Sequence, residues 1–150
     1  MIEASIIIPV KNEPYLPTLL KELKEYEVLV QTEPGLSYAV LQGIKRATNN
    51  NIVIMDGDGS HPVYAIPYML NLLSTYDVVI GSRYIHGGYT EDSWTRIQIS
   101  KFYNRLAQFI LQINVEDNMS GYIVAKRRVF QELNIENTGY KIGLEIIYKS

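Results

Sequence analysis

Residues 52–62 read IVIMDGDGSHP, and this stretch decides the fold class. Four apolar residues run directly into two aspartates, Asp56 and Asp58, which one glycine separates. An uninterrupted apolar run of this kind is typical of a buried strand in a parallel sheet. Ligands of open α/β sheets bind just beyond the carboxyl ends of the strands. We therefore expect Asp56 and Asp58 at the edge of the sheet where such folds bind their substrates.

The two aspartates predict a metal site. Carboxylates this close repel each other unless a cation joins them. A hard divalent ion with oxygen ligands, which also binds the phosphates of a substrate, is the usual partner. We interpret Asp56 and Asp58 as ligands of Mg²⁺ or Mn²⁺, with Ser60 as a further candidate ligand.

Two simpler explanations of the same residues are less satisfactory. Asp-Gly pairs form hairpin turns, which accounts for one such pair but poorly for two in succession after a buried strand. A calcium-binding loop needs Gly at its sixth position and Glu at its twelfth. His61 and Pro67 hold those positions here, so the sequence excludes that loop.

Composition limits the class of protein. The chain has 150 residues, 47% of them apolar, which suits one globular domain over residues 1–150. A net charge of −2 implies no general attraction to nucleic acid. The absence of Cys excludes disulfides and cysteine-ligated metals and fits a cytoplasmic protein. The apolar runs are too short for a membrane span.

Strands and helices alternate along the first half of the chain. Such alternation predicts right-handed βαβ units and an α/β fold, a Rossmann-like and mostly parallel sheet flanked by helices. The expected strands are residues 4–10, 28–30, 52–55 and 77–80, and the expected helices are residues 16–23, 36–47 and 62–73.

The pattern changes after residue 84. Residues 85–92 are polar and contain glycine, which predicts a mobile loop. Residues 93–113 have the apolar spacing of a long amphipathic helix. A short strand or extended segment is expected at residues 122–125, followed by one or two helices.

Polar residues recur at the positions where the predicted strands end. Each has an ordinary explanation as a loop residue, a turn residue or a solvated charge. Arginine at a helix start is unfavourable unless it serves an anion. Together the residues suit a complex of a diphosphate with a metal, in which arginine neutralises charge on a leaving group. They are Asn12, Glu13, Arg83, Arg96, Ser100, Asp117 and Ser120.

Other phosphate-binding and catalytic patterns are missing from the sequence. It contains no GxxxxGK[ST] and no GxGxxG, so neither a P-loop nor a dinucleotide site is supported. It also has no evident His–carboxylate dyad. His61 is a conceivable metal ligand, but we favour a helix-entry residue that packs near the aspartates because Pro62 follows it.

Taken in order, these residues resemble the family 2 glycosyltransferases of the GT-A fold, and within them the dolichyl-phosphate mannose and glucose synthases. The resemblance runs through most of the chain, and MDGDGSHP is similar to the family's acidic DxD motif. Lys11 stands where the family's opening strand usually has tyrosine. The matching segments are SIIIPVKNE at 5–13, GLSYAVLQGIKRA at 35–47, MDGDGSHP at 55–62, VVIGSRY at 78–84, SGY at 120–122 and GYKIGLE at 139–145.

One departure makes the chain a shortened version of the family. Relatives normally end their second strand in an Asp-Asp-Gly-Ser-type motif that holds the nucleoside, followed by another helix and strand. Here residues 27–31 pass through Thr32, Glu33 and Pro34 directly to Gly35. Glu33 and Glu13 are the candidates to replace the missing aspartates.

The resemblance implies a metal-dependent inverting glycosyltransferase. The donor would be a GDP- or UDP-sugar and the acceptor a polyprenyl phosphate, which is already anionic and needs no strong general base. A hydroxyl acceptor would need a base, for which Asp117 and Glu145 are the candidates. The implied catalytic residues are Asp58, Arg83 and Asp117; the implied substrate-binding residues are Pro9, Asn12, Glu13, Asp56, Arg83, Arg96, Ser100 and Ser120.

Two further expectations concern partners. Helix 93–113, with basic residues beside its apolar stripe, predicts peripheral contact with a membrane, although the stripe would equally well cover the sheet. The missing nucleoside motif keeps an alternative open: a catalytically weak or inactive descendant that binds nucleotide sugar, forms a homo-oligomer, or acts as a partner subunit of a full-length glycosyltransferase.

Overall fold

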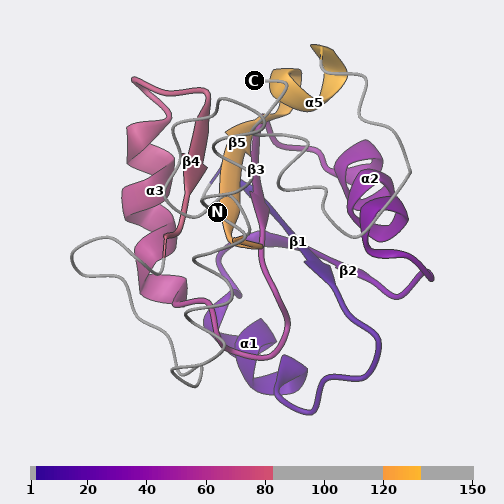
Figure 1. Ribbon diagram of the computed structural model, residues 1–150. Coiled ribbons are helices and arrows are strands. Elements are labelled where there is room, and N and C mark those ends of the chain that lie inside the picture. The colour runs from indigo at the N-terminus through magenta and orange to yellow at the C-terminus, as the bar shows by residue number, and fades with distance from the viewer. Residues whose placement is uncertain (1–2, 83–119, 133–150) are drawn as a thin grey trace, which may run out of the picture.

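The computed structural model describes residues 3–82 and 120–132 (Figure 1). In this part of the chain five strands form one mixed sheet in the order β2-β1-β3-β5-β4. The strands are β1 (Ser5–Pro9), β2 (Glu27–Gln31), β3 (Asn51–Ile54), β4 (Val78–Ile80) and β5 (Ile123–Lys126). The helices are α1 (Leu16–Glu22), α2 (Leu36–Arg46), the short 3₁₀ turn η1 (Val63–Ala65), α3 (Ile66–Leu72) and α5 (Arg127–Glu132).

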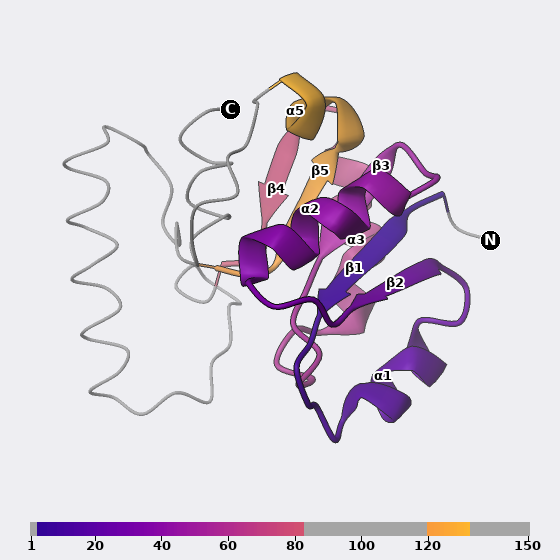
Figure 2. The same ribbon diagram turned by 90° about the vertical axis from the view of Figure 1, so that its right-hand side faces the viewer.

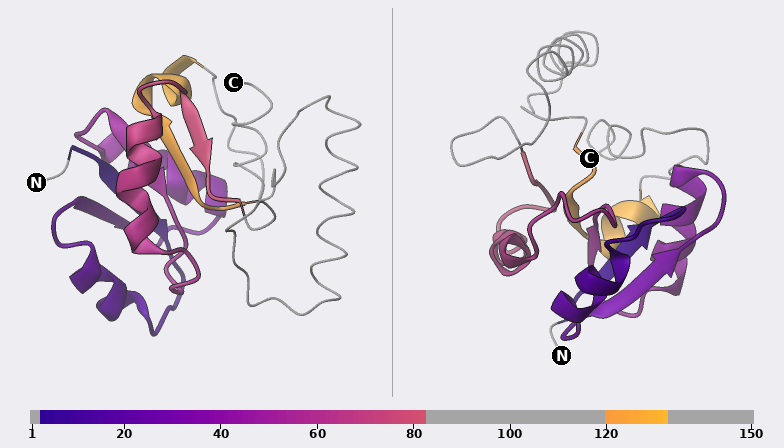
Figure 3. Two further views of the ribbon diagram at one scale, coloured as in Figure 1. Left: turned by 90° about the vertical axis from the view of Figure 1, so that its left-hand side faces the viewer. Right: turned by 90° about the horizontal axis from the view of Figure 1, so that it is seen from below.

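Helices cover both faces of the sheet. Helices α1 and α3 pack on one face with Ile6 and Ile8, whereas α2 and α5 pack on the other face with Ile7. Figure 2 shows α2 in front of the sheet and α3 behind it, and the left view of Figure 3 shows α3 from its own side. Because successive strand residues point to opposite faces, burial on both faces explains why the strands are continuously apolar.

The sheet is mostly parallel, as predicted, but it contains one antiparallel strand. Strand β1 pairs in parallel with β2 and with β3. Strand β5 lies between β3 and β4 and is antiparallel to both, with Ile123 opposite Ile54 and Ile80. The sequence predicted a short strand here, though not its direction or its neighbours. As a result, the residues that precede β5 reach the carboxyl ends of β3 and β4.

The predicted helix at 62–73 is divided in two. Residues 63–65 form η1, and α3 begins at Ile66 with Pro67 in its first turn. Proline has no N–H to bond to the carbonyl four residues earlier, and it is well suited to the first turn of a helix. A regular helix therefore starts only at Ile66.

Helix α2 packs very closely on the sheet at Gly43. A Cβ atom at this position would lie 2.5 Å from Cγ2 of Ile7. Real Cβ atoms do not come so close to a neighbouring carbon, so only glycine allows this contact between α2 and β1.

A polar cluster links β1 and β2 at their amino ends, at the opposite end of the strands from the aspartates. The Glu27 carboxylate accepts hydrogen bonds from the Ser5 hydroxyl, from the Thr48 N–H (3.0 Å) and hydroxyl (2.9 Å), and from the Asn49 amide (3.2 Å). Burial raises the pKa of Glu27, but these hydrogen bonds outweigh it and hold the pKa below its ordinary value. The cluster ties the turn after α2 to the first residues of β1 and β2.

Several predictions lie outside the described residues. These are the loop at 85–92, the helix at 93–113 and any helix after residue 132. The assignment of residues 1–150 to one domain also stays a prediction. Among the described residues, no helix has the length and apolar character needed to cross a membrane.

Candidate active site

The two aspartates follow β3 at the carboxyl edge of the sheet, as the sequence predicted. Strand β3 continues into buried Met55, whose N–H donates to the carbonyl of Ile7 (3.1 Å). The chain then leaves the sheet, and Asp56 and Asp58 are both exposed. Buried strand residues thus carry two carboxylates directly to solvent at the end of the strand.

Asp58 is held by its own loop. Its Oδ1 accepts the N–H of Ser60 (2.9 Å), an Asx turn of the kind that aspartate favours. Burial raises the pKa of Asp58, but hydrogen bonds from the Ser60 N–H and hydroxyl, together with nearby His61, hold the pKa below its ordinary value. Asp58 is therefore ionised at neutral pH, and Ser60 supports it.

His61 lies beside Asp56, so the site contains a His–carboxylate pair that was not evident from the sequence. Its Nδ1 accepts the backbone N–H of Asp56 (3.0 Å), and its Nε2 lies 3.7 Å from Asp56 Oδ2. The imidazole stacks on the Tyr122 ring, with 4.7 Å between centroids and 6° between planes. The prediction that His61 packs near the aspartates agrees with this geometry.

Tyr122 fixes the loop from the other side. Its hydroxyl donates to the carbonyl of Pro62 (2.8 Å), which immediately follows His61. Burial raises the pKa of Tyr122 far above its ordinary value, so the hydroxyl keeps its proton and remains a donor. One side chain therefore supports both the histidine ring and the backbone after it.

The turn before β5 brings a glycine to the acidic loop. The hydroxyl of buried Ser120 donates to the carbonyl of Gly81 (2.7 Å) and accepts the N–H of Tyr122 (3.2 Å). Between Ser120 and Tyr122, Gly121 lies so near Asp56 that a Cβ there would be 3.3 and 3.5 Å from the two carboxylate oxygens. The substrate-binding role of Ser120 stays a prediction, because its hydroxyl bonds within the protein here.

The residues after β1 also reach this edge. Half-buried Pro9 ends the strand, and exposed Asn12 follows in the next loop. Cγ of Glu13 lies 3.5 Å from the position that a Cβ of Gly57 would take. The structure thus brings Glu13 against the acidic loop, while the substrate-binding roles of these three residues stay predictions.

The end of β2 carries polar atoms without hydrogen-bond partners among the described residues. These are Oε1 of Gln31, a residue only 1% exposed, and Oε2 of Glu33. Strand β2 pairs with β1 along its whole length, Gln31 opposite Pro9. Beyond Gln31 the chain continues through Thr32, Glu33 and Pro34 to Gly35, and the role of Glu33 in place of the expected nucleoside-binding aspartates stays a prediction.

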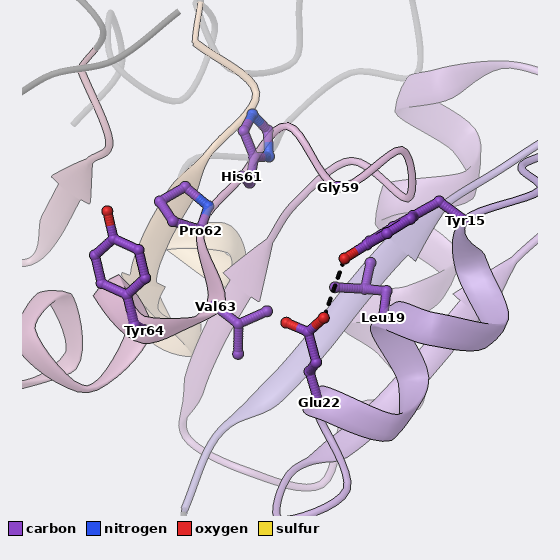
Figure 4. A pocket seen from close by; sticks show the side chains of 8 residues that line it. All are labelled: Tyr15, Leu19, Glu22, Gly59, His61, Pro62, Val63 and Tyr64. Carbon is purple, nitrogen blue, oxygen red and sulfur yellow. Dashed lines mark hydrogen bonds between the residues drawn. The ribbon is translucent and has the colours of Figure 1, made fainter.

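A pocket of about 400 Å³ adjoins the acidic loop (Figure 4). Tyr15, Leu19 and Glu22 of the α1 region face Pro62, Val63 and Tyr64 across it, with Gly59 and His61 completing its lining. The Tyr15 hydroxyl donates to Glu22 Oε1 (3.0 Å). Sequence reasoning missed Tyr15, Glu22 and Tyr64, because nothing in helical periodicity distinguishes them from ordinary surface residues.

Gly59 allows the Tyr15 ring to lie against the loop. Its φ is +83°, a conformation that favours glycine, and a Cβ there would lie 2.6 Å from Tyr15 Cε1.

Some predicted site residues lie outside the described residues. They are the phosphate-binding and catalytic candidates Arg83, Arg96, Ser100 and Asp117, and the alternative base Glu145.

The described donors suit a cation shared with a substrate. Over residues 3–82 and 120–132, no group of three His, Cys, Asp or Glu side chains is arranged to hold a metal ion. Asp56 and Asp58 offer two carboxylates instead. Mg²⁺ is usually bound by one or two carboxylates plus substrate phosphates rather than by an all-protein cage, so these two residues fit it.

Comparison with known proteins places the chain among glycosyl transferases. Residues 18–133 match the family model "Glycosyl transferase family 2". The chain is 34% identical to a dolichol-phosphate mannosyltransferase of Pyrococcus furiosus, over 78% of this chain and 34% of that protein. It is 31% identical to the Saccharomyces cerevisiae protein of the same name, over 81% of this chain and 47% of that protein. An undecaprenyl-phosphate mannosyltransferase of Micrococcus luteus is 28% identical, over 79% of this chain and 52% of that protein.

Solved structures agree on the fold. Glucosyl-3-phosphoglycerate synthase of Mycobacterium tuberculosis, in complex with Mn²⁺, UDP-glucose and phosphoglyceric acid, matches with a TM-score of 0.70. The match covers 95% of this chain and 63% of the synthase chain. At 14% identity this likeness concerns the fold alone. The chain spans about a third to a half of the length of the curated relatives described above.

Proposed function

The chain belongs to glycosyl transferase family 2, and from that premise we propose that it transfers a hexosyl group from a nucleoside-diphosphate sugar to a polyprenyl phosphate. One feature supports this acceptor class, and a second supports the position of the site. Relatives from three organisms are named as mannosyltransferases for dolichol phosphate or undecaprenyl phosphate. The GT-A-like sheet also places the acidic loop where open α/β folds bind their ligands.

The observation that carries the proposal is the pair Asp56 and Asp58 at the carboxyl end of β3. Asp58 is ionised and held by its own loop, and Asp56 is exposed beside the backbone of Gly121. These two carboxylates, with Ser60 as a further candidate, would hold Mg²⁺ or Mn²⁺ against the diphosphate of the donor. When bound, such a cation supplies positive charge that offsets the charge developing on the leaving diphosphate.

The chemistry of the acceptor determines what the protein must supply. A phosphate oxygen would attack the anomeric carbon from the face opposite the diphosphate, and the configuration there would invert. The bond from that carbon to the diphosphate oxygen would break, and the nucleoside diphosphate would leave with the bonding electrons. The attacking oxygen is already anionic at neutral pH, so no general base is needed.

His61 does not contradict this mechanism. Its Nδ1 accepts a backbone N–H, and its Nε2 faces Asp56, so neither ring nitrogen is placed to take a proton from an acceptor. The remaining roles rest on the sequence: Arg83, Arg96 and Ser100 for phosphate groups, and Asp117 as a catalytic residue.

A calorimetric titration tests the proposal. GDP-mannose and UDP-glucose would each be added to the protein with Mn²⁺ and with a chelator. We expect binding of one of them to require Mn²⁺, and Asp58→Asn to weaken that binding sharply while the melting temperature changes little. Binding that is unaffected by chelator or by Asp58→Asn would refute the metal-dependent donor site.

The sequence that follows β2 favours a second candidate function. Relatives carry an Asp-Asp-Gly-Ser-type motif where their second strand ends, but here β2 passes through Thr32, Glu33 and Pro34 directly to Gly35, so the expected nucleoside-binding aspartates are missing. A chain of this kind could bind nucleotide sugar weakly, alone or as a homo-oligomer, or serve a full-length glycosyltransferase as a partner subunit. Transfer of labelled mannose to a short polyprenyl phosphate by the isolated chain would exclude this alternative, and binding without transfer would favour it.

A further inference from the structure

The hydrogen bond between Asp56 and His61 determines where the histidine carries its proton. Nδ1 accepts the Asp56 N–H at 3.0 Å, so Nδ1 itself has no proton. The neutral ring therefore carries its proton on Nε2. Nε2 lies 3.7 Å from Oδ2 of the Asp56 carboxylate, close enough for an electrostatic attraction between the two.

The same arrangement argues against His61 as a metal ligand. A cation on Nε2 would require the ring to lose its second proton while Nδ1 still accepts a hydrogen bond. The ring would then be an anion beside the carboxylates of Asp56 and Asp58, which is unfavourable. His61 thus acts on Asp56 rather than on a cation.

The ring is held in place by contacts from outside the acidic loop. Tyr122 stacks on the imidazole at a centroid distance of 4.7 Å, and its hydroxyl bonds to the carbonyl of Pro62. His61 is also mostly buried, with 15% of its side chain exposed, whereas 52% of the Asp56 side chain is exposed. A mostly buried and stacked ring therefore lies against both the backbone and the carboxylate of an exposed aspartate.

We propose that His61 is a positioning residue, which Tyr122 holds in place and which orients the Asp56 carboxylate toward a divalent cation. The inference rests on the proposed function, since it assigns Asp56 to that cation. Residues that orient a ligand in this way typically contribute 10–100-fold to metal affinity.

The test measures binding of Mn²⁺ in the presence of GDP, or of UDP if the protein prefers it, by the electron paramagnetic resonance signal of free Mn²⁺. Melting temperatures are recorded for every variant. His61→Ala removes both contacts to Asp56. His61→Asn keeps an acceptor where Nδ1 was, but removes the ring and its Nε2–H. Tyr68→Ala is the matched control, because Tyr68 is 69% exposed on α3, in the segment that follows the same loop, and is not part of the pocket lining.

We expect His61→Ala to weaken Mn²⁺ binding by about tenfold, His61→Asn to weaken it less, and Tyr68→Ala to leave it unchanged. Unchanged Mn²⁺ affinity in His61→Ala and His61→Asn, in a protein whose affinity does fall with Asp58→Asn, would overturn the positioning role alone. Equal Mn²⁺ affinity in the unaltered protein and in Asp58→Asn would instead overturn the proposed function itself, and this inference with it. Weaker binding that appears only with a matching fall in melting temperature would indicate a structural role and count against the proposal.

Discussion

The carboxylate of Asp56 lies against the backbone of Gly121, which belongs to the turn before β5. A Cβ at position 121 would be 3.3 Å from one carboxylate oxygen and 3.5 Å from the other. The absence of a side chain at Gly121 therefore leaves room around the oxygens that would bind a cation. This contact joins the loop after β3 to the turn before β5.

Gly121→Ala should weaken Mn²⁺-dependent nucleotide binding by about fivefold. This corresponds to about 1 kcal/mol of binding free energy, which is about the net contribution of one hydrogen bond. The added methyl group would crowd the Asp56 oxygens, while a backbone without positive φ accepts alanine readily. Calorimetry with and without Mn²⁺ measures the effect, and the melting temperature serves as the control. Undiminished affinity would mean that the cation does not use the oxygens facing Gly121.

The Glu27 cluster should make stability depend on pH. Hydrogen bonds to the carboxylate lower its pKa in the folded protein, so its contribution is complete above the ordinary pKa of glutamate. That contribution is lost as the pH falls through the lowered folded-state pKa. Glu27→Gln should destabilise the fold by about 1 kcal/mol at pH 7, a modest value because the carboxylate is partly solvated.

Urea denaturation of both proteins at pH 7 and at several acidic pH values checks this prediction. The difference in unfolding free energy should shrink toward acid, where both side chains are uncharged. A difference that stays constant with pH would show that the charge of Glu27 is not what stabilises the cluster.

Gly43→Ala should destabilise the protein by about 1–3 kcal/mol, the usual effect of overpacking a core. The new Cβ would meet Ile7 Cγ2 at 2.5 Å, and the better helix propensity of alanine returns at most about 1 kcal/mol. Lys45→Ala, at an exposed position of the same helix, is the control and should change stability by less than about 0.5 kcal/mol. Thermal and urea unfolding measure both variants; a stabilised Gly43→Ala would contradict the close contact between α2 and β1.

Peripheral membrane contact, predicted from the sequence of residues 93–113, should depend on salt. Each basic residue near an anionic surface contributes on the order of 1 kcal/mol, and salt screens that attraction. We expect the protein to float with phosphatidylserine-containing vesicles at low salt and to be released at high salt. If it ignores such vesicles at low salt yet transfers sugar to a water-soluble acceptor, both the membrane contact and the lipid acceptor should be abandoned.

Local sequence was sufficient for much of the fold. The apolar run before Asp56 predicted β3 and the position of both aspartates, because a strand buried on both faces must be continuously apolar. The spacing of apolar residues in α2 predicted that helix to within a residue, since one face has to cover the sheet. The antiparallel direction of β5 was not predictable in this way, because an apolar strand specifies that it is buried but not which neighbours it pairs with.

The sequence by itself determined the α/β class, the acidic loop and the family to which the chain belongs. Only the tertiary structure decided what surrounds that loop. The insertion of β5 between β3 and β4 brings Gly121 to Asp56 and Tyr122 to His61, and the packing of α1 forms the pocket beside Gly59. These contacts join residues far apart in the chain, and their geometry follows from strand order and packing, which no local pattern of residues encodes.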